Sequence, residues 1–167
     1  MIRPELYRPI PIDRIADVDI DVRASQAECA ALANRLMLPA VAAVSCRWRC
    51  SVLPGGVFAA EGHLKAEITQ ICVVTLDPFP ARVDERFEVR FVPEDQIGDT
   101  DPDEEIDEIP YQDFEIDLGE ATAEQLALSL DPYPRKPGAV LPPEVSEELD
   151  HPFAALAQLQ TKPAEEN

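Results

Sequence analysis

Alternating apolar and polar positions run through the first half of the chain and predict a β-sheet. The clearest strand covers 44–52, where Val, Cys and Trp at even positions alternate with Ser and Arg at odd positions. Turn residues at 54–56 precede a second long strand over 57–74, and a turn at 77–80 precedes a third over 82–91. Because short turns join these segments, we predict an antiparallel meander with one buried face.

The N-terminal segment predicts two further strands and a helix. Residues 7–12 contain two prolines, which cannot donate to a ladder, so this segment is an edge strand at most. Residues 18–22 alternate apolar and acidic side chains, as a half-buried strand does. Ser25 and Glu28 have the spacing of a capping box, so a helix begins there and ends before Pro39. Its predicted core-facing positions are Cys29, Leu32, Ala33 and Leu36.

Acidic residues dominate the segment after the third strand. Residues 94–117 hold 12 carboxylates and no Lys or Arg. Mutual repulsion favours an extended, hydrated chain, so we predict a mobile acidic loop over 94–108, reaching 110 at its widest. An extended piece at 114–117 then leads to Asp117, the predicted N-cap of a helix over about 119–130. Its predicted packing stripe is Ala123, Leu126, Ala127 and Leu130.

These elements predict one α+β domain over 1–134, an antiparallel β-meander or partly closed barrel with two to three short helices and the acidic loop inside it. Residues 135–167 are predicted to be a proline-rich linker and extended tail with a short C-terminal helix. That helix carries a small apolar set, Phe153, Leu156 and Leu159. Since so short a helix is marginal alone, we expect the set to dock on the domain or on a partner.

Charge is distributed unevenly along the chain. The 14 basic and 33 acidic residues give a net charge of −19, yet residues 35–92 sum to +1, so the rest carries −20. Such a balance disfavours binding to phosphate backbones or anionic membranes. No stretch has the length and apolarity of a membrane helix or a secretion signal. We expect a cytoplasmic protein, monomeric, with no membrane partner.

The four cysteines are interpreted as free, buried thiols. On one regular strand Cys46 and Cys50 would lie about 13 Å apart, too far for a disulfide or a shared zinc ion. Cys72 could approach one of them across the sheet, but His63 is predicted on the opposite face. We therefore expect no metal and no cofactor.

The sequence offers no catalytic constellation. Residues 99–105 are rich in carboxylates but lack the glycine and terminal glutamate of an EF-hand loop. Neither His63 nor His151 has a nucleophile at a recognisable spacing, and no phosphate-binding glycine motif occurs. We expect no enzymatic activity and no catalytic residue.

The polar face of the predicted meander gathers six basic residues, which is more than the net charge suggests. Acidic neighbours such as Glu67, Asp84 and Glu88 share this face, so it fits either a lattice of cross-strand ion pairs or a contact with RNA. Trp48 alternates inward and is interpreted as a core residue rather than a base-stacking platform. The possible RNA face consists of Arg47, Arg49, Lys65, Arg82, Arg86 and Arg90.

The order of motifs resembles the YceD family, the large ribosomal RNA subunit accumulation proteins. The resemblance is carried by the following segments: Val44-Ser45-Cys46, 69–79, 83–93 with Phe87 and Phe91, 114–120, 124–134 and Pro152-Phe153-Ala154. It implies a bacterial protein needed for synthesis, processing or stability of the 23S ribosomal RNA, with no catalytic activity. Many members carry Cys-x-x-Cys where this chain has Cys72-Val73-Val74-Thr75, so the resemblance does not extend to their zinc site.

Two functions remain open at this stage. The first is an assembly factor whose acidic loop holds a basic ribosomal protein or a large-subunit assembly intermediate. The second is direct binding of a ribosomal RNA precursor by the arginine-bearing face, and a zinc-binding module is a third reading. The predicted partner-binding residues of the loop are Glu94, Asp95, Asp99, Asp101, Asp103, Glu104, Glu105, Asp107 and Glu108.

Overall fold

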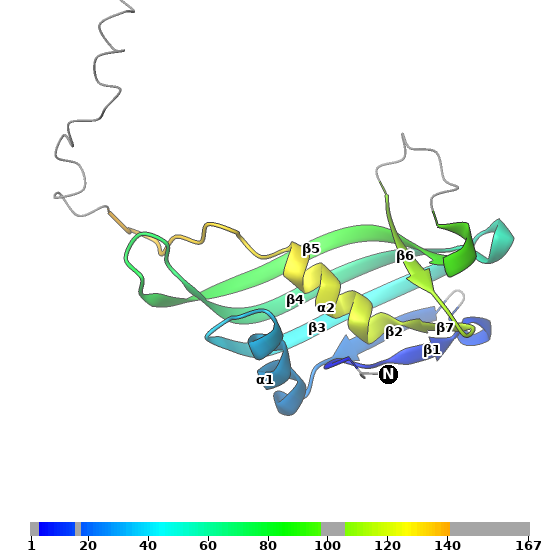
Figure 1. The fold of residues 1–167 in the computed structure, drawn as a ribbon, viewed down its shortest axis with the longest axis horizontal. Helices are drawn as coiled ribbons and strands as arrows, with labels where there is room; N and C mark the ends of the chain where they lie inside the picture. The colour runs from blue at the N-terminus through cyan, green and yellow to red at the C-terminus, as the bar shows by residue number, and fades with distance from the viewer. Residues whose placement is uncertain (1–3, 16–17, 98–105, 141–167) are drawn as a thin grey trace, which may run out of the picture.

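A curved five-stranded sheet forms the centre of the computed structural model, which describes residues 4–15, 18–97 and 106–140 (Figure 1). Its strands lie in the order β2-β3-β4-β5-β6, and the first four are antiparallel neighbours. The bounds are β2 (Val18–Arg23), β3 (Ala40–Val52), β4 (Phe58–Ile71), β5 (Pro78–Pro93) and β6 (Asp107–Tyr111). The antiparallel meander is therefore confirmed as the main body of an α+β fold.

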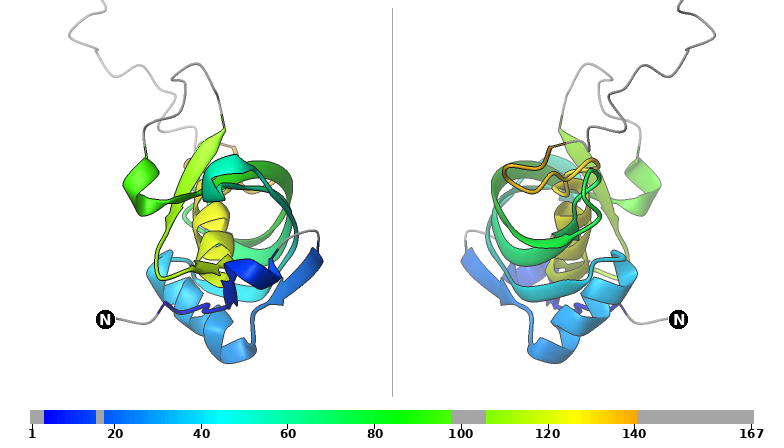
Figure 2. Two further views of the ribbon diagram at one scale, coloured as in Figure 1. Left: turned by 90° about the vertical axis from the view of Figure 1, so that its right-hand side faces the viewer. Right: turned by 90° about the vertical axis from the view of Figure 1, so that its left-hand side faces the viewer.

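Two helices pack against this sheet. The first, α1 (Gln26–Arg35), begins at the predicted capping box: the Ser25 hydroxyl accepts from Glu28 N, and the Glu28 carboxylate accepts from Ser25 N at 2.7 Å. The second, α2 (Leu118–Leu128), begins at the predicted N-cap Asp117 and lies inside the curve of the sheet (Figure 2). Three single turns of 3-10 helix complete the described part: η1 (Ile12–Arg14), η2 (Pro54–Gly56) and η3 (Glu94–Gln96).

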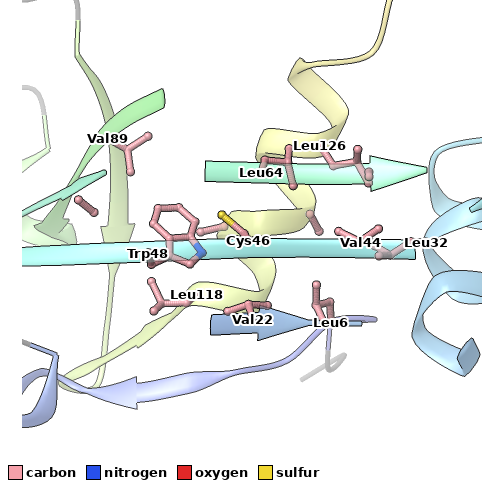
Figure 3. Packing of buried hydrophobic residues seen from close by; sticks show 14 of the residues in the cluster. Leu6, Val22, Leu32, Val44, Cys46, Trp48, Leu64, Val89, Leu118 and Leu126 are labelled. Atoms are coloured by element: carbon pink, nitrogen blue, oxygen red, sulfur yellow. The ribbon is translucent and has the colours of Figure 1, made fainter. Parts of the chain in front are cut away.

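The core fills the space between α2 and the concave face of the sheet. Trp48 is fully buried there, which confirms its interpretation as a core residue, and its Nε1 donates to Thr122 Oγ1 at 3.0 Å. Thr122 Oγ1 in turn donates to Leu118 O at 2.7 Å, so neither buried polar group lacks a partner. Figure 3 shows Leu118 and Leu126 of α2 among the core residues of the strands.

A glycine in β4 accommodates the aromatic side chains of its neighbours. Gly62 pairs with Trp48 on one side and Phe87 on the other, and the two rings meet edge to face with centroids 5.1 Å apart. A Cβ atom at this position would lie 2.1 Å from Phe87 Cζ. The ring contact is therefore possible only because residue 62 is a glycine and has no side chain.

A small second sheet fixes the N-terminal end of α2. It consists of β1 (Pro9–Pro11) and β7 (Glu115–Asp117), which run antiparallel. Leu118 N donates to Arg8 O at 3.2 Å, and a Cβ on Gly119 would lie 2.4 Å from Leu6 O. The predicted edge strand over 7–12 is thus confirmed, with its partner more than 100 residues away.

Four details differ from the sequence predictions. Residues 107–111 are not loop: they form β6, parallel to β5 over 89–93. The sheet has β2 and β6 as its edges in the described part, so it does not close into a barrel. The reversal before β5 occurs at 72–77, and Pro78 and Pro80 lie inside β5, whose outer edge is unpaired there. Ala127 is exposed, since the buried face of α2 runs through Leu118, Thr122, Gln125 and Leu126.

Residues 131–140 lie against the connection between β4 and β5. Val73 N donates to Pro134 O at 2.9 Å, and Gln70 Nε2 donates to Asp131 O at 3.3 Å. The predicted C-terminal helix with Phe153, Leu156 and Leu159 falls outside the described residues. Among the helices that the structure describes, none has the length and apolarity needed to cross a membrane.

Candidate interaction surfaces

The outer face of the sheet, the one turned away from α2, carries all six residues of the possible RNA face. Arg47, Arg49, Lys65, Arg82 and Arg86 are exposed, and Arg90 is half-buried. Strand register sets carboxylates beside them: Arg49 pairs with Asp19 on β2 and Glu61 on β4. The same face holds six exposed carboxylates: Asp19, Asp21, Glu61, Glu67, Asp84 and Glu88. Register adds Arg23 on β2 and Glu108 on β6, so seven basic and seven acidic side chains give a formal charge of zero.

Ion pairs join most of these cations to carboxylates on neighbouring strands. Each pair is exposed, as expected for cross-strand pairs on the solvent face of a sheet. The nitrogen-to-oxygen distances are 3.1 Å for Arg47–Asp21, 3.0 Å for Arg49–Asp19, 3.6 Å for Lys65–Asp84 and 3.5 Å for Arg82–Glu67. A hydrogen bond of 2.6 Å joins His63 Nε2 to Asp84 Oδ1 on the same face. The lattice of cross-strand ion pairs is the arrangement found. Arg86 makes no ion pair within the described part of the chain.

The pairing is visible in the pKa values of the carboxyls. The hydrogen bond and charge of Arg49 lower the pKa of Asp19 below its usual range. The hydrogen bond from His63, with the charge of Lys65, lowers the pKa of Asp84. Both carboxylates are therefore held in their charged form by this face.

The predicted acidic loop is divided among three structural contexts. Glu94 and Asp95 lie in η3, and Asp107 and Glu108 lie in β6. The remaining members lie outside the described residues: Asp99, Asp101, Asp103, Glu104 and Glu105. β6 therefore anchors the second end of the predicted loop to the edge of the sheet.

A cleft between α2 and the segment β6–β7 collects carboxylates that the loop prediction did not include. It has a volume of about 240 Å³ and contains apolar side chains such as Phe91, Ile109 and Tyr111. We call it the acidic cleft; its carboxylates are Glu115, Asp117, Glu120 and Glu124. It lies on the opposite side of the sheet from the ion-pair lattice, because α2 packs on the concave face.

Asp117 has a structural role in the acidic cleft. Its Oδ1 accepts from Arg8 N at 2.8 Å, from Gly119 N at 2.9 Å and from Glu120 N at 3.2 Å. These bonds cap α2 and fix residues 8–10 beside it. The second oxygen, Oδ2, is buried and has no hydrogen-bond partner within the described part of the chain.

The other carboxylates of the acidic cleft differ in their partners. Glu120 forms a two-point contact with Arg35, at 2.6 and 2.8 Å, and Arg35 also reaches Glu5 at 3.0 Å. Glu115 and Glu124 have no ion pair among the described residues. Partial burial, and next the charge of Glu120, raise the pKa of Glu124. The cleft thus has negative charge that the described residues do not fully neutralise.

One sequence signal could have revealed the acidic cleft. No Lys or Arg occurs anywhere from 91 to 134, whereas 15 Asp and Glu do. The predicted site stopped at Glu108 because the later carboxylates belong to regular elements. Only the fold brings Glu115 of β7 beside Glu124, two turns into α2.

All four cysteines are buried and free, as predicted. Desolvation raises the pKa of Cys46 to about 12 and that of Cys50 to about 11. Cys72 differs: hydrogen bonding from the Thr75 side chain, with backbone amides nearby, lowers its pKa to about 7. Thr75 N lies 3.4 Å from its Sγ. No group of three or more metal-type ligands occurs in the part of the chain that the structure describes.

Comparison with known protein families supplies the context for these surfaces. The sequence model of the family described as large ribosomal RNA subunit accumulation protein YceD matches residues 60–160. The chain belongs to the YceD family. The match covers β4 to α2, and with them the acidic cleft, and it continues through 141–160. A search of curated proteins and a search of solved structures gave no match.

The family assignment bears on chemistry as well as on fold. The name of the YceD family refers to the accumulation of a ribosomal RNA and not to a reaction.

Proposed function

We propose that this chain supports the accumulation of the large ribosomal RNA subunit as a non-enzymatic factor that binds a basic ribosomal protein through its acidic side. Membership in the YceD family supports the ribosomal role. The observation that supports the mode of action is the acidic cleft, whose carboxylates Glu115 and Glu124 lack ion-pair partners in the described residues.

The acidic cleft has the chemistry to accept an Arg or Lys side chain of such a partner. Its apolar wall, formed in part by Phe91 and Ile109, suits the aliphatic stem, and the carboxylates suit the charged head. A cation between Glu120 and Glu124 would also relieve the repulsion that raises the pKa of Glu124. The cleft therefore offers two exposed carboxylates, Glu115 and Glu124, that a cationic group of a partner can contact.

The residues next to the acidic cleft extend its field. Glu94 and Asp95 follow β5 in η3, Asp107 begins β6, and the 91–134 stretch has no cation in the sequence. A surface of one sign raises the rate of encounter with a protein of the opposite sign and suppresses like-charged partners such as RNA. In this mechanism the acidic side shields a basic ribosomal protein until it reaches its RNA site.

Direct RNA binding by the outer face is the second candidate. Arg86, which makes no ion pair in the described part, lies in register with His63 on the next strand and is the observation in its favour. Against it stands the formal neutrality of the face, where Arg47, Arg49 and Arg82 already contact carboxylates. Nucleic-acid contact would have to break these pairs.

The test compares two double variants of equal charge change. Glu115→Gln with Glu124→Gln removes two charges from the acidic cleft, and Glu61→Gln with Glu88→Gln removes two from the outer face. Each purified full-length protein is incubated with the basic proteins extracted from large ribosomal subunits, and separately with a 23S ribosomal RNA transcript. Retention is measured at about 0.05 and 0.5 M salt, where screening differs several-fold.

We expect the cleft variant to retain a basic protein roughly tenfold less well at low salt, since two close charge contacts are lost. The outer-face variant should bind as the unaltered protein does. Binding that persists at high salt, or that falls equally in both variants, would contradict the proposal. Retention of the RNA transcript that disappears on Arg86→Ala would favour the second candidate instead.

A further inference from the structure

One end of the sheet exposes large apolar side chains that the fold does not cover. We call this set the end patch; its members are Val73 and Leu76 of the β4–β5 connection, Leu128 at the end of α2, and Tyr133 and Val140 beyond it. Their exposed fractions run from 45% for Val73 to 79% for Val140. Single exposed apolar residues are ordinary, but a contiguous group marks a contact surface.

Contacts between the segments show that the end patch is continuous. Val73 N donates to Pro134 O at 2.9 Å, and the Lys136 ammonium lies 3.6 Å from Asp77. These bonds hold residues 131–136 beside the β4–β5 connection, and Figure 1 shows the two segments at the same end of the sheet. Val73 and Leu76 therefore lie in a segment that neighbours Tyr133, while Leu128 and Val140 adjoin the 131–136 segment along the chain.

Leu76 is the most unusual member of the end patch. It has a φ of +60° and is 75% exposed. Glycine or asparagine occupies this left-handed region with less strain than leucine does. Neither local backbone geometry nor the core explains a leucine here, whereas an apolar contact with a further segment would.

The segment best placed to cover the end patch is the C-terminal part of this same chain. Val140, the last described residue, belongs to the patch, and 27 residues follow it. Among them Phe153, Leu156 and Leu159 recur at the spacing of one helix face. Eleven residues lie between Val140 and Pro152 and span up to about 40 Å when extended, so the apolar set can fold back onto the patch.

Charge and tethering favour the same occupant. Arg135 is exposed and makes no ion pair in the described part of the chain, while Glu144, Glu147, Glu148 and Asp150 precede Phe153. A short tether also gives the segment an effective concentration in the millimolar range, well above that of a free partner. The YceD match runs to residue 160 and so includes this apolar set.

We propose that the C-terminal segment docks in cis on the end patch through Phe153, Leu156 and Leu159. Helix formation by this segment is coupled to docking, because a helix of fewer than three turns gains its stability from tertiary contact. The proposal does not depend on the basic partner, since the end patch and the acidic cleft share no residue.

The test is amide hydrogen exchange on the full chain with a matched pair of variants. Leu76→Asn replaces the apolar side chain by one that suits the same backbone, so the fold is retained. Phe114→Asn is the control: Phe114 has a φ of +58°, is 76% exposed, and precedes β7 at the other end of the molecule. The reciprocal variant is Phe153→Asp, with exchange followed at the amides of Val73 and Leu76.

We expect amides 153–159 of the unaltered protein to exchange at least about tenfold more slowly than the same sequence as a free peptide. Leu76→Asn should remove that protection and Phe114→Asn should leave it, while Phe153→Asp should speed exchange at Val73 and Leu76. The proposal is overturned if the segment is unprotected, if the two Asn variants behave alike, or if protection appears only as protein concentration rises, which would indicate docking on a second copy.

Discussion

The outer face of the sheet and the acidic side around α2 differ in how far their carboxylates are paired with cations. On the outer face, register places Asp19 beside Arg49 and Asp21 beside Arg47, and the sum of charges is zero. On the acidic side, the acidic cleft gathers Glu115, Asp117, Glu120 and Glu124, and among the described residues only Arg35 forms an ion pair with them. The comparison teaches that register balances the charges of the outer face, whereas Glu115 and Glu124 of the acidic cleft have no ion pair among the described residues.

The largest expected effect comes from disturbing the close contact between Gly119 of α2 and the backbone of Leu6 and Arg8, which holds the acidic side together, while the outer face stays intact. Gly119→Ala places a Cβ 2.4 Å from Leu6 O and 2.8 Å from Arg8 N, both backbone atoms that cannot rotate away. We expect a loss of about 3 kcal/mol in the free energy of unfolding by urea, at the upper end for overpacking. Gly62→Ala is the comparison, because it meets the ring of Phe87, a side chain that can move. An equal or larger loss in unfolding free energy for Gly62→Ala would contradict the expectation that the Gly119 contact tolerates a side chain less well.

A medium effect on stability is expected from substitutions of Asp117. Two of them distinguish its role as a helix cap from the effect of its charge. Asp117→Ala removes the acceptor of three backbone amides and should cost about 1–2 kcal/mol in urea unfolding. Asp117→Asn keeps an acceptor and removes a charge whose Oδ2 has no partner in the described residues, so it should cost clearly less. If Asn is as harmful as Ala, the negative charge at the start of α2 is what stabilises the helix.

The smallest expected effect is a pH-dependent change in Tm, which has opposite signs for variants of the two sides. Glu124 has a folded pKa raised above 4.5, so its ionisation opposes folding above that raised pKa and has no effect below 4.5. Glu124→Gln should therefore raise Tm by about 1 °C at neutral pH, with the gain vanishing as the pH falls below 4.5. Asp19 has a folded pKa below 3.8, so its contribution to stability is present above 3.8 and is lost as the pH falls through the lowered value.

Asp19→Asn is accordingly the control of opposite sign. It should lower Tm slightly at neutral pH, and the difference should disappear in acid. Thermal melts of the three proteins between pH 3 and 7 measure both curves. The same sign for both variants would contradict the contrast between a paired face and an unpaired cleft.

Local signals were sufficient for much of the fold. Alternation around Trp48 and Leu64 predicted both the strands and their buried faces, because side chains of a strand alternate whatever the strand pairs with. Ser25 and Glu28, like Asp117, act within a few residues of themselves, so their caps could be predicted from spacing. The ion-pair lattice also follows from alternation once the register of the hairpins is set.

Other features had no local signal. The parallel pairing of β6 with β5 requires the chain to return to the sheet, and composition does not encode such a return. The run of carboxylates therefore led to the prediction of a loop that included the start of β6. Ala127 fits a helical stripe by spacing, but the curve of the sheet buries the face of α2 that includes Thr122 and Gln125 instead.

The sequence by itself determined the α+β class, the strand faces, the caps of both helices and the family to which the chain belongs, because each depends on short-range periodicity or on ordered motifs. Only the tertiary structure decided that β1 pairs with β7 and that Glu115, Asp117, Glu120 and Glu124 share one cleft. The physical reason is that a cleft is formed by segments that meet through long-range packing, and packing depends on shape and volume that no single segment contains.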